Sequence, residues 1–138
     1  MSNMLKISEG LSEAQEVAEK LSKEQEKIKN ILSEALLKAE RQKQRILQFW
    51  GDLLLLIQMV RAYFSKEYTR TPWKSIIFAL AAIIYFLNPF DMIPDVAPAL
   101  GFLDDATVIA FVVNAIKEDI EAYKKFLGKN TSKVDSKA

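Results

Sequence analysis

The sequence predicts an all-α protein: a long amphipathic N-terminal helix of coiled-coil type, followed by a compact apolar helical hairpin unit. Apolar residues recur at alternating steps of four and three through the first sixty positions. Two later segments are apolar on every face, as in helices that need cover on all sides. The four prolines stand at position 72 and within 88–105, so they punctuate the chain between helices.

Composition limits the function classes open to this chain. Its 138 residues carry 19 Lys and Arg against 18 Asp and Glu, and this net charge of +1 argues against nucleic acid as a partner. Cys and His are absent, which excludes disulfides, zinc-finger spacings, a thiol nucleophile and an imidazole base. The four glycines are too scattered for a phosphate-binding loop. We therefore expect a protein that is not an enzyme and holds no cofactor.

The N-terminal helix is predicted over residues 7–63. Ser12 and Gln15 form a capping box, and between there and Tyr68 the only classical helix weakener is Gly51. The pattern predicts one very long helix or two abutting ones, acting as a coiled coil that self-associates or binds a partner. The alternative is an amphipathic helix that folds back on its own chain. The seam, interrupted at Gln25 and Gln42, comprises Ile7, Leu11, Ala14, Ala18, Leu21, Ile28, Leu32, Ala35, Ala39, Ile46, Phe49, Leu53, Leu56, Val60 and Tyr63.

The apolar unit begins near residue 49. After the polar connection 65–71, Thr71 and Pro72 predict the start of a helix over 73–87, with Thr as the cap and Pro in the first turn. This helix has no polar stripe, so it is buried in protein or in lipid. It rises about 22 Å against about 30 Å of hydrocarbon. A shorter apolar helix is predicted over 106–116.

The charges around the two apolar helices favour a membrane hairpin. Basic residues precede the first helix and follow the second, while the connection between them holds four Asp and no base. This is the positive-inside pattern, with Trp73 at interface depth. The alternative is a soluble bundle whose central helices are wrapped by the N-terminal helix. The flanking bases are Lys66, Arg70, Lys74, Lys117, Lys124 and Lys125.

The connection 88–105 combines three prolines with large apolar residues and four carboxylates: Asp91, Asp95, Asp104 and Asp105. The simplest interpretation is that these side chains cap helices and turns, opposing the positive ends of helix dipoles. A second is that they converge on a hard divalent cation, which takes carboxylate oxygens. A third is a catalytic acid and base pair.

The same segment resembles the bacterial YkvA family, also called DUF1232. The resemblance rests on Pro89-Phe90-Asp91-Met92-Ile93-Pro94-Asp95 followed by Gly101-Phe102-Leu103-Asp104-Asp105, with Pro72, Trp73 and Tyr85 before them. Asn88 stands where Ser is expected. The resemblance covers residues 49–127, leaving 1–48 as an extension and 128–138 as a tail that we expect to be disordered. It implies a membrane-associated helical hairpin and no established activity. The motif residues are Pro89, Asp91, Pro94, Asp95, Gly101, Asp104 and Asp105.

Together these observations predict a non-enzymatic membrane-associated module whose hairpin anchors it while the N-terminal helix self-associates or binds a partner. We expect it at the bacterial cytoplasmic membrane with both termini in the cytoplasm, and no cleaved leader, because 1–9 lack an apolar run. The alternatives are a soluble helical-bundle interaction protein and a metal-dependent hydrolase that uses the four Asp.

Overall fold

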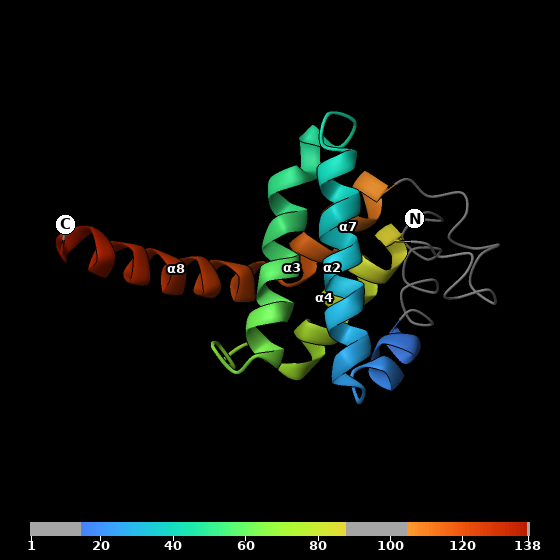
Figure 1. Ribbon diagram of the computed structural model, residues 1–138, viewed down its shortest axis with the longest axis horizontal. Helices are drawn as coiled ribbons and strands as arrows, with labels where there is room; N and C mark the ends of the chain where they lie inside the picture. Colours follow the sequence, from blue (N-terminus) through green and yellow to red (C-terminus); the bar gives the residue numbers. More distant parts are fainter. Residues whose placement is uncertain (1–14, 88–104, 138) are drawn as a thin grey trace.

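The computed structural model describes residues 15–87 and 105–137, and every regular element among them is a helix (Figure 1). The predicted all-α class is therefore confirmed. The elements are a short helix over 15–21, α2 (Gln25–Arg41), the 3-10 turn η1 (Leu47–Phe49), α3 (Trp50–Phe64), α4 (Trp73–Leu87), α7 (Asp105–Ala115) and α8 (Lys117–Lys137).

The predicted long N-terminal helix is divided into three pieces. It is broken at 22–24 and again at 42–46, so that α2 and α3 lie side by side (Figure 1). The seam residues of both helices enter one hydrophobic core, among them Ala35, Ala39, Leu53 and Leu56. The chain reverses at Gln42, a polar interruption of the seam, because both apolar faces can then be buried against the same neighbours. Within the described residues, the amphipathic segment therefore folds back on its own chain. This was the stated alternative to a coiled coil.

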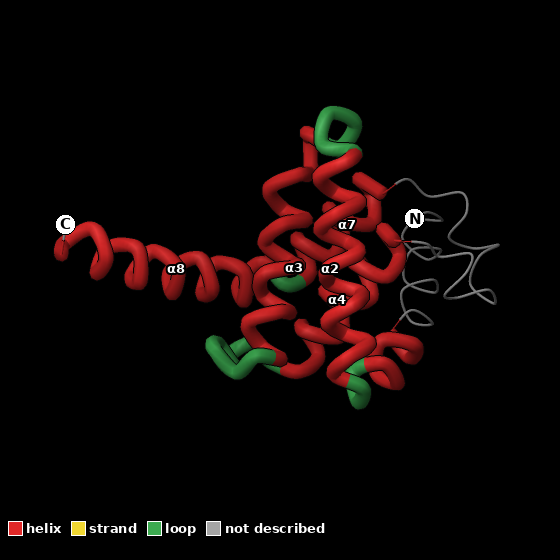
Figure 2. The backbone as a smooth tube through the Cα atoms, viewed as in Figure 1, coloured by secondary structure: helices red, strands yellow, loops and turns green. Residues whose placement is uncertain are grey.

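Helix α4 is the centre of this bundle. Helices α2, α3 and α7 all pack against it (Figure 2). Burial of large apolar side chains contributes about 1.5–3 kcal/mol each, so the many buried side chains of α4 make a large contribution to stability. Its side chains contact protein on all sides, and the buried ones are Ser75, Ile76, Ile77, Ala79, Leu80, Ala81, Ala82, Ile83, Ile84, Tyr85 and Phe86.

In the described ranges 15–87 and 105–137, no helix has both the length and the apolar character that crossing a membrane requires.

The boundary expected at residue 48 falls within the packed structure. Buried side chains of α2, such as Ile28 and Leu32, belong to the same core as those of α3 and α4. Residue 48 itself lies in η1, between two helices that contact each other. The segment before residue 49 therefore contributes to the fold of the segment after it.

The start of α4 differs from the sequence-based expectation by one residue. The helix begins at Trp73. The carbonyl oxygen of Pro72 accepts hydrogen bonds from the amide nitrogens of Ser75 and Ile76, at 3.0 and 3.1 Å. The Thr71 hydroxyl is buried and has no hydrogen-bond partner among the described residues. Pro72 thus occupies the cap position predicted for Thr71, since its carbonyl accepts the first bonds of the helix.

Helix α3 ends in a Schellman motif. The amide of Glu67 donates to the Ala62 carbonyl at 2.9 Å, and the amide of Lys66 donates to the Tyr63 carbonyl at 3.2 Å. Lys66 takes the left-handed conformation at the centre of this motif, with φ of 68°. A side chain at such a position is strained, because Cβ approaches the backbone.

We expect Lys66→Gly to raise the free energy of unfolding by about 1 kcal/mol, because glycine adopts the left-handed region without steric cost. Urea unfolding followed by circular dichroism measures the change. Ser65→Gly serves as the control, since Ser65 has a right-handed φ of −84° and gains nothing from glycine there. A destabilised Lys66→Gly variant would show that the Lys66 side chain stabilises the fold.

Helix α8 is helical as far as Lys137 and projects from the bundle (Figure 1), which differs from the disordered tail expected over 128–138. The sequence after residue 98 contains no proline, and Gly128 is its one glycine beyond α7, so little local chemistry ends the helix.

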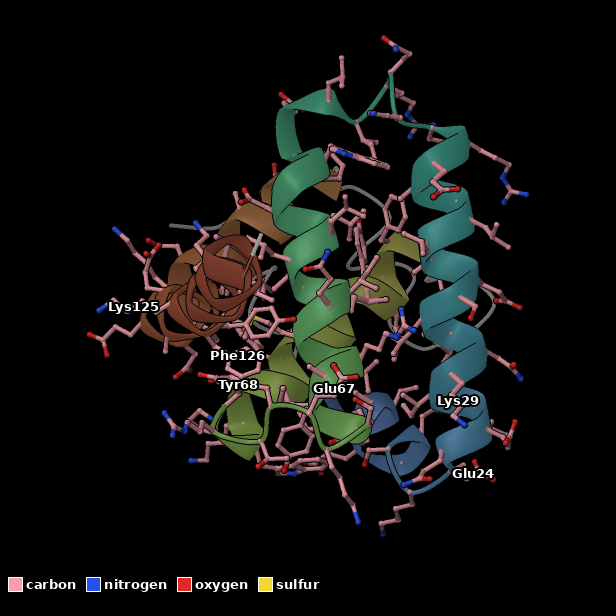
Figure 3. All side chains as sticks on the ribbon, turned by 60° about the vertical axis from the view of Figure 1, so that its left-hand side comes forward. Glu24, Lys29, Glu67, Tyr68, Lys125 and Phe126 are labelled. Carbon is pink, nitrogen blue, oxygen red and sulfur yellow. The ribbon has the colours of Figure 1, made fainter. Side chains whose placement is uncertain are left out.

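An aromatic cluster anchors the first half of α8 (Figure 3). The Tyr68 ring lies 5.2 Å from that of Tyr123 and 4.7 Å from that of Phe126, measured between centroids. Burial raises the pKa of the Tyr123 hydroxyl, and the nearby Glu67 and Tyr68 raise it further. The cluster therefore ties α8 to the connection between α3 and α4.

Candidate functional site

The acidic connection lies almost entirely outside the described residues. This applies to Pro89, Asp91, Pro94, Asp95, Gly101 and Asp104, whereas Asp105 is the first residue of α7. In the described part of the chain, no three His, Cys, Asp or Glu side chains gather as a metal site would require. The capping, cation-binding and catalytic interpretations of the four Asp therefore stay predictions.

What the structure does describe is the frame that holds the connection at both ends. Helix α4 ends at Leu87 and α7 begins at Asp105, and these two helices pack against each other. The rings of Phe78 and Phe111 meet edge to face, with centroids 6.1 Å apart. The connection therefore begins and ends at two helices that are packed against each other.

Lys38 of α2 binds the end of α4 from which the connection leaves. Its ammonium donates to the carbonyls of Phe86 and Leu87 at 2.6 and 3.0 Å. The same ammonium lies 4.8 Å from the centroid of the Phe86 ring. These carbonyls belong to the last turn of α4, where no later N–H group of the helix donates a hydrogen bond to them. The negative end of the helix dipole lies at the same place. A cation is therefore favoured at this position.

Sequence reasoning missed Lys38, because it appeared to be one of many charges on the solvated flank of the N-terminal helix. One signal was present: Lys38 lies three residues after Ala35 and directly before Ala39, at the edge of the buried seam. A long side chain there can place its ammonium beside a neighbouring helix end.

A second polar contact links the other end of α4 to α8. The hydroxyl of Ser75, which is buried, donates to the carboxylate of Asp119. Asp119 lies in the first turn of α8, where its negative charge also interacts favourably with the positive end of the helix dipole. Both ends of α4 are thus joined to other helices by charge-assisted hydrogen bonds, which are stronger than neutral ones.

An apolar groove runs between α2 and α3. Half of its lining residues are aliphatic or aromatic, and Lys29 and Arg61 are the charged members. It is lined by Gln25, Ile28, Lys29, Leu32, Ser33, Leu36, Ile57, Arg61, Phe64 and Ser65. The groove lies within the segment for which the sequence predicts a protein partner or self-association.

Comparison with known proteins places the chain in a family. The model of DUF1232, described as a protein of unknown function, matches residues 75–111, which run from the first turn of α4 into α7 and include the connection. The chain belongs to this family. It is similar to the uncharacterized membrane protein YkvA of Bacillus subtilis, with 35% identity over 92 residues, 67% of this chain and 83% of the relative. No solved structure matches the chain. The predicted resemblance is confirmed.

Proposed function

We propose that this protein is a non-enzymatic helical module that associates with the bacterial cytoplasmic membrane. One observation carries the proposal: the relative with 35% identity, most of whose length is aligned, is named a membrane protein. In this proposal both termini lie in the cytoplasm, on the side whose leaflet carries the anionic lipids that attract basic residues. The absence of His and Cys from the whole sequence supports a role without catalysis.

The burial of α4 bears on how the module attaches. Its side chains are enclosed by α2, α3 and α7, so in this fold they are turned toward protein. Exposing them to lipid would require the bundle to open and forfeit that packing. We therefore propose attachment through the outer surface of the folded bundle, in place of the anchoring hairpin predicted from the sequence.

Membrane fractionation of cells that express the full chain tests this proposal. We expect the protein to sediment with membranes and to be released by high salt or alkaline carbonate before any detergent is added, as surface attachment requires. A known integral protein and a known cytosolic protein from the same cells serve as controls. Recovery in the soluble fraction would contradict membrane association. Retention until detergent would instead contradict attachment by the surface alone.

A second candidate is a helical-bundle protein that binds another protein while remaining in solution. The apolar groove between α2 and α3 is the observation that favours it. The same fractionation separates the two candidates, because this one keeps the chain in the soluble fraction without detergent.

A further inference from the structure

The turn that joins α2 to α3 is rich in basic residues. Residues 41–50 contain Arg41, Lys43 and Arg45 and no acidic residue. All three basic side chains are exposed. The turn lies at one end of the α2 and α3 pair, while the connection 65–72 lies at the other end (Figure 2).

Two large apolar side chains are exposed beside these charges. Leu47, in η1, is 55% exposed, and Leu37, one helical turn before Arg41, is 57% exposed. They are two of the three exposed large hydrophobic residues among the described residues. Single exposed leucines are common on proteins, but here each lies within four residues of a basic side chain of the turn, and Glu40 is the one acidic residue of the segment 37–47.

The core holds this turn in place. Ile46 and Phe49 are 2% and 7% exposed and belong to the hydrophobic core, whereas Leu47 between them points away from it. The amide of Ile46 donates to the Gln42 carbonyl and the amide of Phe49 to the Ile46 carbonyl, each at 3.0 Å. Leu47 is therefore presented on a rigid support, so that its exposure is a property of the fold.

Trp50 adds an interfacial side chain at the same end. It is half-buried, and the Lys43 ammonium lies 5.0 Å from the centroid of its ring. Aromatic rings with a polar edge, next to basic side chains, are typical of segments that lie at the headgroup level of a membrane.

We propose that this end of the bundle docks on anionic lipid headgroups through a turn surface formed by Leu37, Arg41, Lys43, Arg45 and Leu47. The inference rests on the proposed membrane association and names the surface and the lipid that it needs. The bases bind the negative headgroups, and the two leucines enter the boundary between headgroups and acyl chains.

The opposite end of the bundle provides the comparison. Residues 65–74 also carry three bases, Lys66, Arg70 and Lys74, but Glu67 lies among them. The exposed apolar residue there is Trp73, whose ring lies 5.8 Å from that of Tyr63 and packs within the protein's own aromatic residues. That end therefore has less net charge and fewer free apolar groups.

Sedimentation of the full-length protein with vesicles tests the inference. The vesicles are an equal mixture of phosphatidylglycerol and phosphatidylcholine, or phosphatidylcholine alone. We expect binding to the anionic vesicles that weakens with salt. Replacing Arg41, Lys43 and Arg45 together with Gln should lower the partition coefficient about 100-fold, because each base contributes about fivefold near an anionic surface. Leu37→Ser with Leu47→Ser should lower it about tenfold.

The matched control replaces Lys66, Arg70 and Lys74 with Gln, which changes the net charge by the same amount. We expect it to lower binding less than about threefold, because its distance from the docked lipid exceeds a Debye length of about 8 Å. Circular dichroism confirms that each variant is folded. Docking through the turn surface would be contradicted if the two triple variants lost vesicle binding equally, or if the variant at Arg41, Lys43 and Arg45 bound fully. Either result would leave membrane association intact. Failure of the unaltered protein to bind anionic vesicles would also contradict docking through the turn surface, and cell fractionation then decides the proposed function separately.

Discussion

Leu80→Ala should lower the free energy of unfolding by about 2–5 kcal/mol, one of the largest effects expected of a single substitution here. Leu80 lies in α4 and is 0% exposed. Truncation removes buried apolar surface and leaves a cavity that helices α2, α3 and α7 fill only in part. Urea unfolding of the purified protein without detergent, followed by circular dichroism, measures the loss.

Leu37→Ala is the matched control, because the same chemical change is made on a side chain that is 57% exposed. We expect a change within about 0.5 kcal/mol. Equal and small losses for the two variants would contradict the enclosure of α4 by protein, on which the proposed attachment through the outer surface depends. This comparison therefore tests the fold without reference to membranes.

Lys38→Met should lower the free energy of unfolding by about 2–3 kcal/mol. Methionine keeps much of the aliphatic stem but removes the ammonium that binds the Phe86 and Leu87 carbonyls. The last turn of α4 then loses two charge-assisted hydrogen bonds and the favourable interaction of a cation with the end of its dipole. The measurement is again urea unfolding, with the slope of the transition checked to be unchanged.

Lys29→Met is the control for Lys38, since Lys29 lies on the same helix and is exposed. It should change stability by less than about 0.5 kcal/mol. If Lys38→Met is equally mild, then water replaces the ammonium at these carbonyls and α2 does not fix the end of α4. A large effect would mean that the segment before residue 49 helps to position the start of the acidic connection.

The local chemistry of the chain was enough to predict several elements. The continuous apolar runs predicted helices at 73–87 and 106–116, close to the observed α4 and α7, because such runs are too long for strands and lack internal prolines. The spacing of Pro89, Asp91 and Pro94 with Gly101 and Asp104 was specific enough to indicate the family that the comparisons confirm. These features depend on neighbouring residues alone.

The candidate site could be predicted only in part, because its best-described contact joins residues far apart in the sequence. Lys38 and Phe86 are separated by 48 positions, and no local pattern says which helix end a lysine will reach. The Ser75 and Asp119 pair is separated by 44 positions and is equally invisible to spacing rules. Such contacts follow from packing.

The sequence by itself determined the helical class, the position of the apolar segments and the family of this protein. Only the tertiary structure decided that the N-terminal seam turns at Gln42 and packs against α4, in place of one continuous helix. A seam of apolar residues shows that a face must be buried, but it does not say against what. That choice depends on the total area that competing arrangements bury, which is a property of the whole chain.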